Sequence, residues 1–217
     1  MPQYSYAFFD LDGTVIDSAP GVTGCVRYAM EQLGRPIPPE RDLTCFIGPT
    51  LLYGFSNFCG LDPIDSQKAV DLYRVRYRAG GMFECRVYEG VEELLKELNA
   101  RGIPCVLATC KPHEFATQIV AHFGLDKYFT LMVGPEISGL RNEKHEVIAY
   151  AMEQLGITDP SKILMVGDRD NDVLGAFKNN VACVGVRWGF GSEAELMDSG
   201  ACGMLDSPAE LLRYFEN

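Results

Sequence analysis

The sequence lacks the features that define several large classes of protein. None of its eight cysteines forms a C-x-x-C pair, so neither a zinc knuckle nor a dithiol redox motif is predicted. No apolar run approaches the roughly 20 residues that a membrane-spanning helix needs. The N-terminus shows no basic and apolar stretches of a signal sequence. Scattered cysteines favour a reducing compartment, so we expect a cytoplasmic protein with no membrane partner.

Basic residues are also scarce. The chain has 19 Lys and Arg against 30 Asp and Glu, which gives a formal net charge of −11. Nucleic-acid binding depends on neutralising phosphates with cationic side chains, so a nucleic-acid partner is disfavoured, whereas a small anion in a local pocket is not. With 217 residues, 47% of them hydrophobic, the chain can form a packed core.

Short apolar strands alternate with helices over most of the chain. A first strand ends at Asp10 and Asp12, and the alternation resumes after residue 88. There we expect helices at 90–100, 112–123, 144–155 and 172–179, and strands at 103–109, 128–133, 162–166 and 182–186. Such alternation predicts a parallel sheet with helices on both faces. We therefore expect a doubly wound, Rossmann-like α/β core formed by 1–17 and 88–217.

The segment between these two parts carries no strand pattern. Its apolar residues follow helical spacing, and we expect helices at about 21–33, 40–45, 50–58 and 65–79. We interpret residues 18–87 as an all-helical domain inserted after the first strand. The pattern does not distinguish a monomer from a homodimer.

Polar residues capable of chemistry stand where the predicted strands end. In an open parallel sheet, ligands bind at the carboxyl ends of the strands. Asp10 and Asp12 lie two residues apart in an extended segment, so they point to the same side. Thr109 and the backbone N–H groups that follow it, at the start of a helix, suit an anion. The acidic stretch 167–172 follows the fourth predicted strand, so several carboxylates are predicted to converge at one edge.

Converging carboxylates stay ionised when a cation binds between them. Asp10 and Asp168 offer the hard oxygen ligands that Mg²⁺ prefers, and Asp172 is a direct or a supporting ligand. Thr109 and Lys144 could neutralise the charge that develops during phosphoryl transfer. One carboxylate could attack phosphorus to form an aspartyl-phosphate, while a second protonates the leaving oxygen and then activates water.

The segment Asp10-Leu11-Asp12-Gly13-Thr14 resembles the first motif of the haloacid dehalogenase (HAD) superfamily, in its phosphatase branch. The resemblance spans nearly the whole chain. It implies that Asp10 is the nucleophile and that Asp12 is the general acid and base, with a backbone carbonyl that ligates Mg²⁺. It also matches the motif residues that follow later in the chain: Thr109, Lys144, Gly167, Asp168 and Asp172.

The resemblance further implies that the helical block is a mobile cap. Within the superfamily the chain is most similar to phosphoglycolate phosphatase-like proteins. The segment Phe46-Ile47-Gly48-Pro49 is similar to one in the 5′-nucleotidase-like subgroup. The segment Thr109-Cys110-Lys111-Pro112 departs from that subgroup by having Cys110 where it has Ser or Asn. We expect Thr109, Cys110 and Lys144 to bind phosphate.

The sequence therefore predicts an Mg²⁺-dependent phosphatase that hydrolyses a small phosphomonoester through an aspartyl-phosphate on Asp10. The expected partner is a small phosphorylated metabolite, such as phosphoglycolate or a nucleoside monophosphate. Two alternatives stay open. A phosphomutase of the β-phosphoglucomutase type would share the core motifs, and a non-catalytic phosphate-binding protein would share the fold.

Overall fold

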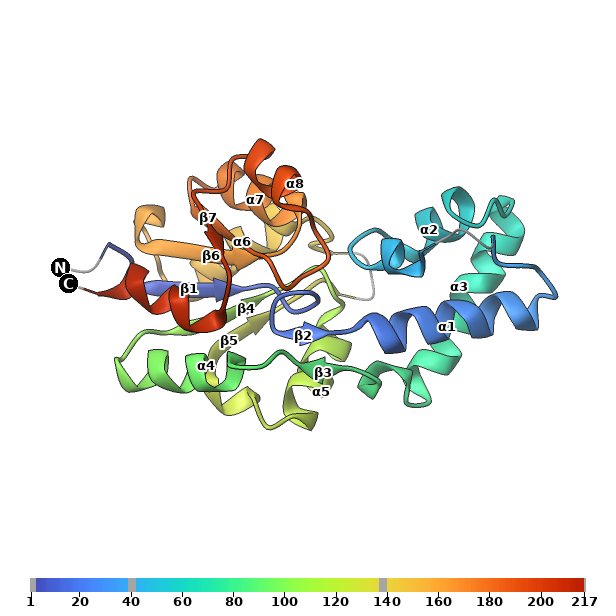
Figure 1. Cartoon of the computed structure of the whole chain (residues 1–217), viewed down its shortest axis with the longest axis horizontal. Helices are drawn as coiled ribbons and strands as arrows, with labels where there is room; N and C mark the ends of the chain where they lie inside the picture. The colour runs from blue at the N-terminus through green and yellow to red at the C-terminus, as the bar shows by residue number, and fades with distance from the viewer. Residues whose placement is uncertain (1–2, 39–41, 137–139, 217) are drawn as a thin grey trace. The chain divides into compact units, whose positions relative to one another are not determined.

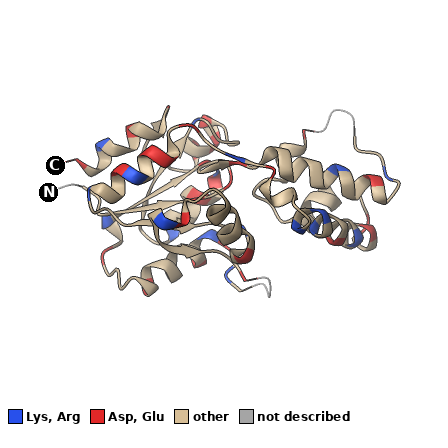
Figure 2. Cartoon of the chain, turned by 90° about the horizontal axis from the view of Figure 1, so that it is seen from below, with Lys and Arg blue, Asp and Glu red and all other residues tan. Residues whose placement is uncertain are grey.

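The computed structural model describes residues 3–38, 42–136 and 140–216 (Figure 1). The chain divides into two compact units. One comprises residues 1–16 and 87–217, and the other comprises residues 17–86. Figure 2 shows basic and acidic positions interspersed over the described parts of both units. None of the described helices is long and apolar enough to cross a membrane.

The first unit is built on a six-stranded sheet in the order β5-β4-β1-β6-β7-β8, and every neighbouring pair is parallel. From the N-terminus the strands are β1 (Tyr6–Phe9), β4 (Cys105–Ala108), β5 (Phe129–Val133), β6 (Ile163–Gly167), β7 (Ala182–Val186) and β8 (Met204–Leu205). The predicted doubly wound α/β fold is thus confirmed. The chain runs from β1 to β4 and β5 and then crosses to β6 on the other side, which makes β1 the switch point of the sheet.

Helices cover both faces of this sheet (Figure 1). They are α4 (Val91–Ala100), α5 (His113–His122), α6 (Lys144–Gln154), α7 (Asp170–Lys178) and α8 (Glu193–Asp198), with 3-10 turns at Asp126–Tyr128, Pro160–Lys162 and Pro208–Phe215. Phe8 packs into one cluster with residues of α6, α7 and α8. Its neighbours Ala7 and Phe9 are equally buried and point to the opposite face, because side chains alternate along a strand. A strand buried on both faces explains why this sequence reads as a continuous apolar run.

The structure also contains elements that the sequence analysis did not predict. These are β8, α8 and the 3-10 helix Pro208–Phe215, all of which follow the last predicted strand. A strand of two residues and a helix of six are too short to give a readable periodicity. Another unpredicted pair, β2 (Ile16–Asp17) and β3 (Arg86–Val87), forms a two-stranded sheet at the points where the chain passes from one unit to the other.

Apart from the strand residues Asp17 and Arg86 at its two ends, the regular structure described in the second unit is helical. It contains α1 (Ala19–Gln32), α2 (Leu51–Asn57) and α3 (Pro63–Arg78), with 3-10 turns at Leu43–Phe46 and Gly81–Phe83. The first part of the helix expected at 40–45 lies outside the described residues. Phe46 and Phe55 pack edge to face, with ring centroids 5.1 Å apart. A methyl group on Gly21 would lie 2.2 Å from the carbonyl oxygen of Gly81, so this contact requires glycine.

Candidate active site

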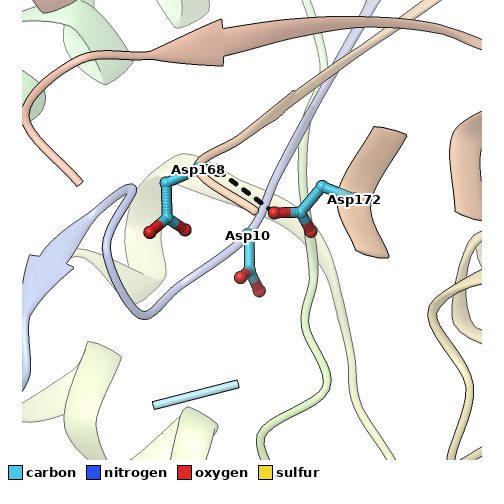
Figure 3. A group of neighbouring side chains, drawn as sticks. All are labelled: Asp10, Asp168 and Asp172. Atoms are coloured by element: carbon cyan, nitrogen blue, oxygen red, sulfur yellow. Dashed lines mark hydrogen bonds between the residues drawn. The ribbon is translucent and has the colours of Figure 1, made fainter. Parts of the chain in front are cut away.

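Three buried carboxylates meet at the carboxyl ends of β1 and β6. Asp10 directly follows β1, Asp168 directly follows β6, and Asp172 lies in the first turn of α7. Each contributes an oxygen, and these oxygens lie within 4.8 Å of one another (Figure 3). Asp168 and Asp172 are fully buried, and Asp10 is 8% exposed. The structure therefore brings together the three carboxylates that the sequence analysis placed at this edge of the sheet.

Two glycines make room for this cluster. Gly13 has φ +79°, and a Cβ there would lie 2.0 Å from Asp168 Oδ2. A Cβ on Gly167 would lie 2.3 Å from the carboxylate of Asp172. Any larger residue at either position would have to displace a carboxylate of the cluster. The glycines of the two acidic motifs are thus required by packing against the site.

Lys144, the first residue of α6, provides the cluster with a buried positive charge. Its Nζ lies 2.8 Å from Asp10 Oδ1 and 2.8 Å from Asp172 Oδ1, and it donates a hydrogen bond to the carbonyl oxygen of Ala108 at 2.9 Å. Burial alone would lower the pKa of Lys144, but the two carboxylates outweigh burial and hold this pKa well above its ordinary value. Lys144 therefore carries its charge at neutral pH.

Asp168 and Asp172 are fixed by backbone donors. Asp172 Oδ2 accepts hydrogen bonds from the N–H groups of Asp168 and Arg169, each at 3.1 Å, and Asp168 Oδ2 accepts one from Phe190 N–H at 2.8 Å. Burial, together with the neighbouring carboxylates, raises the pKa of Asp168 well above its ordinary value. Burial also raises the pKa of Asp172, to about 6. A cation bound beside these two carboxylates would therefore stabilise the ionised form of each of them.

Asp12 faces a second lysine, which the sequence analysis did not single out. Lys111 Nζ lies 2.9 Å from Asp12 Oδ2, and the two side chains are 8% and 17% exposed. The hydroxyl of Thr109, a residue that is 1% exposed, accepts a hydrogen bond from the backbone N–H of Lys111 at 3.1 Å. Lysine at a helix start is commonly a surface residue, and the signal for Lys111 was its place in the segment Thr109-Cys110-Lys111-Pro112, which is similar to a segment of the 5′-nucleotidase-like subgroup.

Cys110 lies between Thr109 and Lys111 in the sequence. Its Sγ is 3.9 Å from Asn171 Nδ2, and burial raises its pKa to about 12. The thiol is therefore neutral at physiological pH and can act as a weak hydrogen-bond donor. Its predicted contact with phosphate stays a prediction.

The charges of the site suit a divalent cation. Four carboxylates (Asp10, Asp12, Asp168 and Asp172) face two ammonium groups (Lys111 and Lys144), so these described residues have a formal charge of −2 when every carboxylate is ionised. Oδ1 of Asp10, of Asp12 and of Asp172 is buried and receives no hydrogen bond of good angle, although Lys144 Nζ lies close to two of the three. Buried carboxylate oxygens with spare acceptor capacity are the ligands that Mg²⁺ binds, so these residues fit that ion.

A doubly wound parallel sheet with an acidic cluster at its switch point places the chain in the class of Rossmann-like hydrolases. More narrowly, the chain belongs to the haloacid dehalogenase-like hydrolase family, whose model matches residues 7–186. The family predicted from the motifs is thereby confirmed, as is the prediction that the protein is an enzyme of the phosphatase type.

The relatives carry several names. The chain is 43% identical over 194 residues to a 5′-nucleotidase from Pseudomonas aeruginosa, covering 89% of this chain and 87% of the relative. It is 35% identical to Tyrosine-protein kinase PtkA from Mycobacterium tuberculosis over 88% of this chain but only 64% of that protein. A phosphoglycolate phosphatase from Photobacterium profundum is 30% identical, over 94% of this chain and 92% of the relative.

A solved structure supports the fold over nearly the whole chain. The crystal structure of a predicted phosphatase from Clostridium acetobutylicum is 42% identical, covers 96% of both chains and superposes with a TM-score of 0.86. The match includes residues of both compact units.

Proposed function

We propose that the protein is an Mg²⁺-dependent phosphatase that hydrolyses a small phosphomonoester through an aspartyl-phosphate on Asp10. The observation that carries the proposal is the position of Asp10. It lies at the switch point of the sheet, 2.8 Å from a buried lysine and beside two carboxylates that fit a divalent cation. An ionised, positioned carboxylate with cationic groups beside it is what nucleophilic attack on a phosphoryl group requires.

The reaction divides into two displacements at phosphorus. In the first, an oxygen of Asp10 bonds to phosphorus, the bond from phosphorus to the leaving oxygen breaks, and Asp12 gives that oxygen its proton. In the second, a water molecule loses a proton to Asp12 and attacks phosphorus, which releases inorganic phosphate and regenerates Asp10. Thr109 and Lys144 hold the phosphoryl oxygens.

A Mg²⁺ ion, held by Asp10, Asp168 and Asp172 with the backbone carbonyl of Asp12, would neutralise negative charge on the phosphoryl group. Lys144 orients the Asp10 carboxylate, because its Nζ also bonds the carbonyl oxygen of Ala108 and so cannot move freely. The nucleophile and the proton donor thus both follow β1, and the oriented cation begins α6, the helix after β5.

For the substrate we propose a small phosphorylated metabolite, with a nucleoside 5′-monophosphate as the first compound to test and phosphoglycolate as the second. This order follows the names and identities of the relatives, 43% for the 5′-nucleotidase and 30% for the phosphoglycolate phosphatase. We propose that the helical segment 18–87 is the cap that selects among them. A cytoplasmic location and a monomeric or homodimeric state belong to the same proposal.

The test is phosphate release from a panel of small phosphomonoesters, with Mg²⁺ and with EDTA. We expect metal-dependent release, and we expect Asp10→Asn to lower kcat at least about 10³-fold, as loss of a nucleophile does. Asp170→Asn is the matched control, since Asp170 begins the same helix as Asp172 but lies outside the cluster. Wild-type turnover by Asp10→Asn would refute the mechanism.

The two alternatives give different results in the same assay. A phosphomutase would convert a sugar phosphate into its isomer and release little phosphate. A non-catalytic binding protein would retain Mg²⁺ and phosphate but turn over no compound of the panel.

A further inference from the structure

The two carboxylate oxygens of Asp12 have different surroundings. Oδ2 lies 2.9 Å from Lys111 Nζ, in an ion pair whose two side chains are 8% and 17% exposed. Oδ1 is buried and has no hydrogen-bond donor among the described residues. Because water screens such a sheltered pair only weakly, the attraction fixes one oxygen and leaves the other available. The carboxylate is thereby held in one rotational position.

The sequence around Lys111 fixes the backbone from which this side chain extends. Pro112 restricts the residue before it to extended conformations. The backbone N–H of Lys111 donates to Thr109 Oγ1 at 3.1 Å. On its other side, a Cβ on Gly134 would lie 2.5 Å from the carbonyl oxygen of Lys111, so the glycine lets the segment after β5 approach. The direction of the lysine side chain therefore follows from Thr109, Pro112 and Gly134 together.

The backbone of Asp12 is equally constrained. Gly13 N–H donates to Ile16 O at 2.9 Å, and Ile16 N–H donates to Leu11 O at 3.0 Å, which closes a tight loop around the residue. The ion pair between Asp12 and Lys111 therefore joins two residues whose backbones are both constrained. Its effect is on the orientation of the carboxylate, which no other described donor sets.

We propose that Lys111 is a positioning residue for Asp12. It holds Oδ2 so that Oδ1 is the oxygen that gives the proton to the leaving group and later takes one from the attacking water. This inference rests on the proposed function, in which Asp12 is the acid and base. It assigns a role to Lys111 that follows from the ion pair and the unsatisfied oxygen.

The role has a consequence that depends on the leaving group. An alkoxide leaving group needs a proton in the transition state, whereas p-nitrophenolate leaves with little help. General acid catalysis contributes about 10²–10⁴-fold to a rate. If Lys111 orients the acid, Lys111→Met should lower kcat/KM, which reports the first displacement, by about 10- to 100-fold on an alkyl phosphomonoester. On p-nitrophenyl phosphate the same variant should lose less than about 3-fold in kcat/KM, since the first displacement of that substrate makes little use of the acid.

The experiment measures kcat and KM of the full-length protein with Mg²⁺ on two substrates. One is p-nitrophenyl phosphate and the other is the alkyl phosphomonoester that the wild type hydrolyses fastest. Lys96→Met, at an exposed position of α4, is the matched control and should leave both rates unchanged. In an Asp12→Asn background, Lys111→Met should have no further effect on the alkyl substrate, because the acid that it orients is absent.

Gly134→Ala is a second variant, for the case that Lys111→Met does not fold. It displaces the Lys111 backbone without removing a charge and should lower the alkyl-to-aryl rate ratio in the same direction. A loss of kcat/KM that is equal on both substrates, or one that persists with Asp12→Asn, would overturn the inference and leave the phosphatase intact. A wild type that hydrolyses neither substrate would overturn the proposed function and this inference with it.

Discussion

Replacing Lys144 by methionine tests the electrostatic account of the site. The side chain is 3% exposed, and its Nζ lies 2.8 Å from two buried carboxylates. Methionine nearly preserves the volume but removes the charge, so that Asp10 and Asp172 lose the ammonium group that lies beside both of them. Removing one member of a buried ion pair costs about 3–5 kcal/mol. We therefore expect the metal-free variant to lose about that much free energy of unfolding near neutral pH.

The measurement is urea unfolding followed by fluorescence of the single tryptophan, Trp188, whose indole N–H donates to Thr14 O within the same unit. Two further conditions separate electrostatics from packing. Mg²⁺ should reduce the loss, because a divalent cation replaces the missing charge, and Asp172→Asn in the same chain should recover part of it. Lys96→Met, which removes an exposed lysine, should change the free energy of unfolding by less than about 0.5 kcal/mol.

One result would refute this reasoning. If Lys144→Met changes the free energy of unfolding by less than about 1 kcal/mol, removing the charge beside two buried carboxylates destabilises the protein far less than the loss of a buried ion pair is expected to do. A loss that neither Mg²⁺ nor Asp172→Asn reduces would point to packing of the lysine stem, with its charge playing no part in the stability of the site.

Two further predictions concern the metal and the glycine loop. Because burial raises the pKa of Asp172 to about 6, the folded form binds more protons than the unfolded chain from about pH 4 to 6. Stability of the metal-free protein should fall as pH rises through this window, and Mg²⁺ should raise Tm more at neutral pH than at about pH 5. Gly13→Ala should lower kcat about 100-fold through displacement of Asp168, whereas Gly34→Ala, whose Cβ meets nothing within 4 Å, should retain activity.

The strands and helices that the sequence predicted are those with a strong apolar signal. β1, β4 and β6 are buried on both faces, so their apolar runs are continuous and end at Asp10, Thr109 and Asp168, which are buried polar residues. β8 and α8 stayed unpredicted because each buries only a few side chains, such as Leu205 and Leu196. The periodicity of apolar residues becomes visible only when an element buries several side chains, and short elements such as β8 and α8 bury too few for a pattern to be recognised.

Residues of the site could be predicted where the motif itself carries chemistry. A pair of carboxylates after a buried strand has no structural purpose there, and this made Asp10 and Asp12 visible. Lys111 stands in a segment similar to a subgroup motif, but the segment does not indicate its partner, because Asp12 is 99 positions earlier in the sequence. Their contact depends on the neighbouring positions of β1 and β4 in the sheet, an order that alternation of strands and helices leaves open.

The charge balance of the site has the same origin. Lys111 follows β4 and Lys144 begins the helix after β5, and each meets a carboxylate that follows β1. If β1 were an edge strand of the sheet, it would have only one neighbouring strand, and the residues that follow it could meet the end of only one other strand. Its central position between β4 and β6 brings Asp10 close both to Lys144, whose Nζ also bonds the carbonyl oxygen of Ala108 in β4, and to Asp168, which follows β6. The strand order therefore accounts for the gathering of these charges at one place, where we propose that a divalent cation binds.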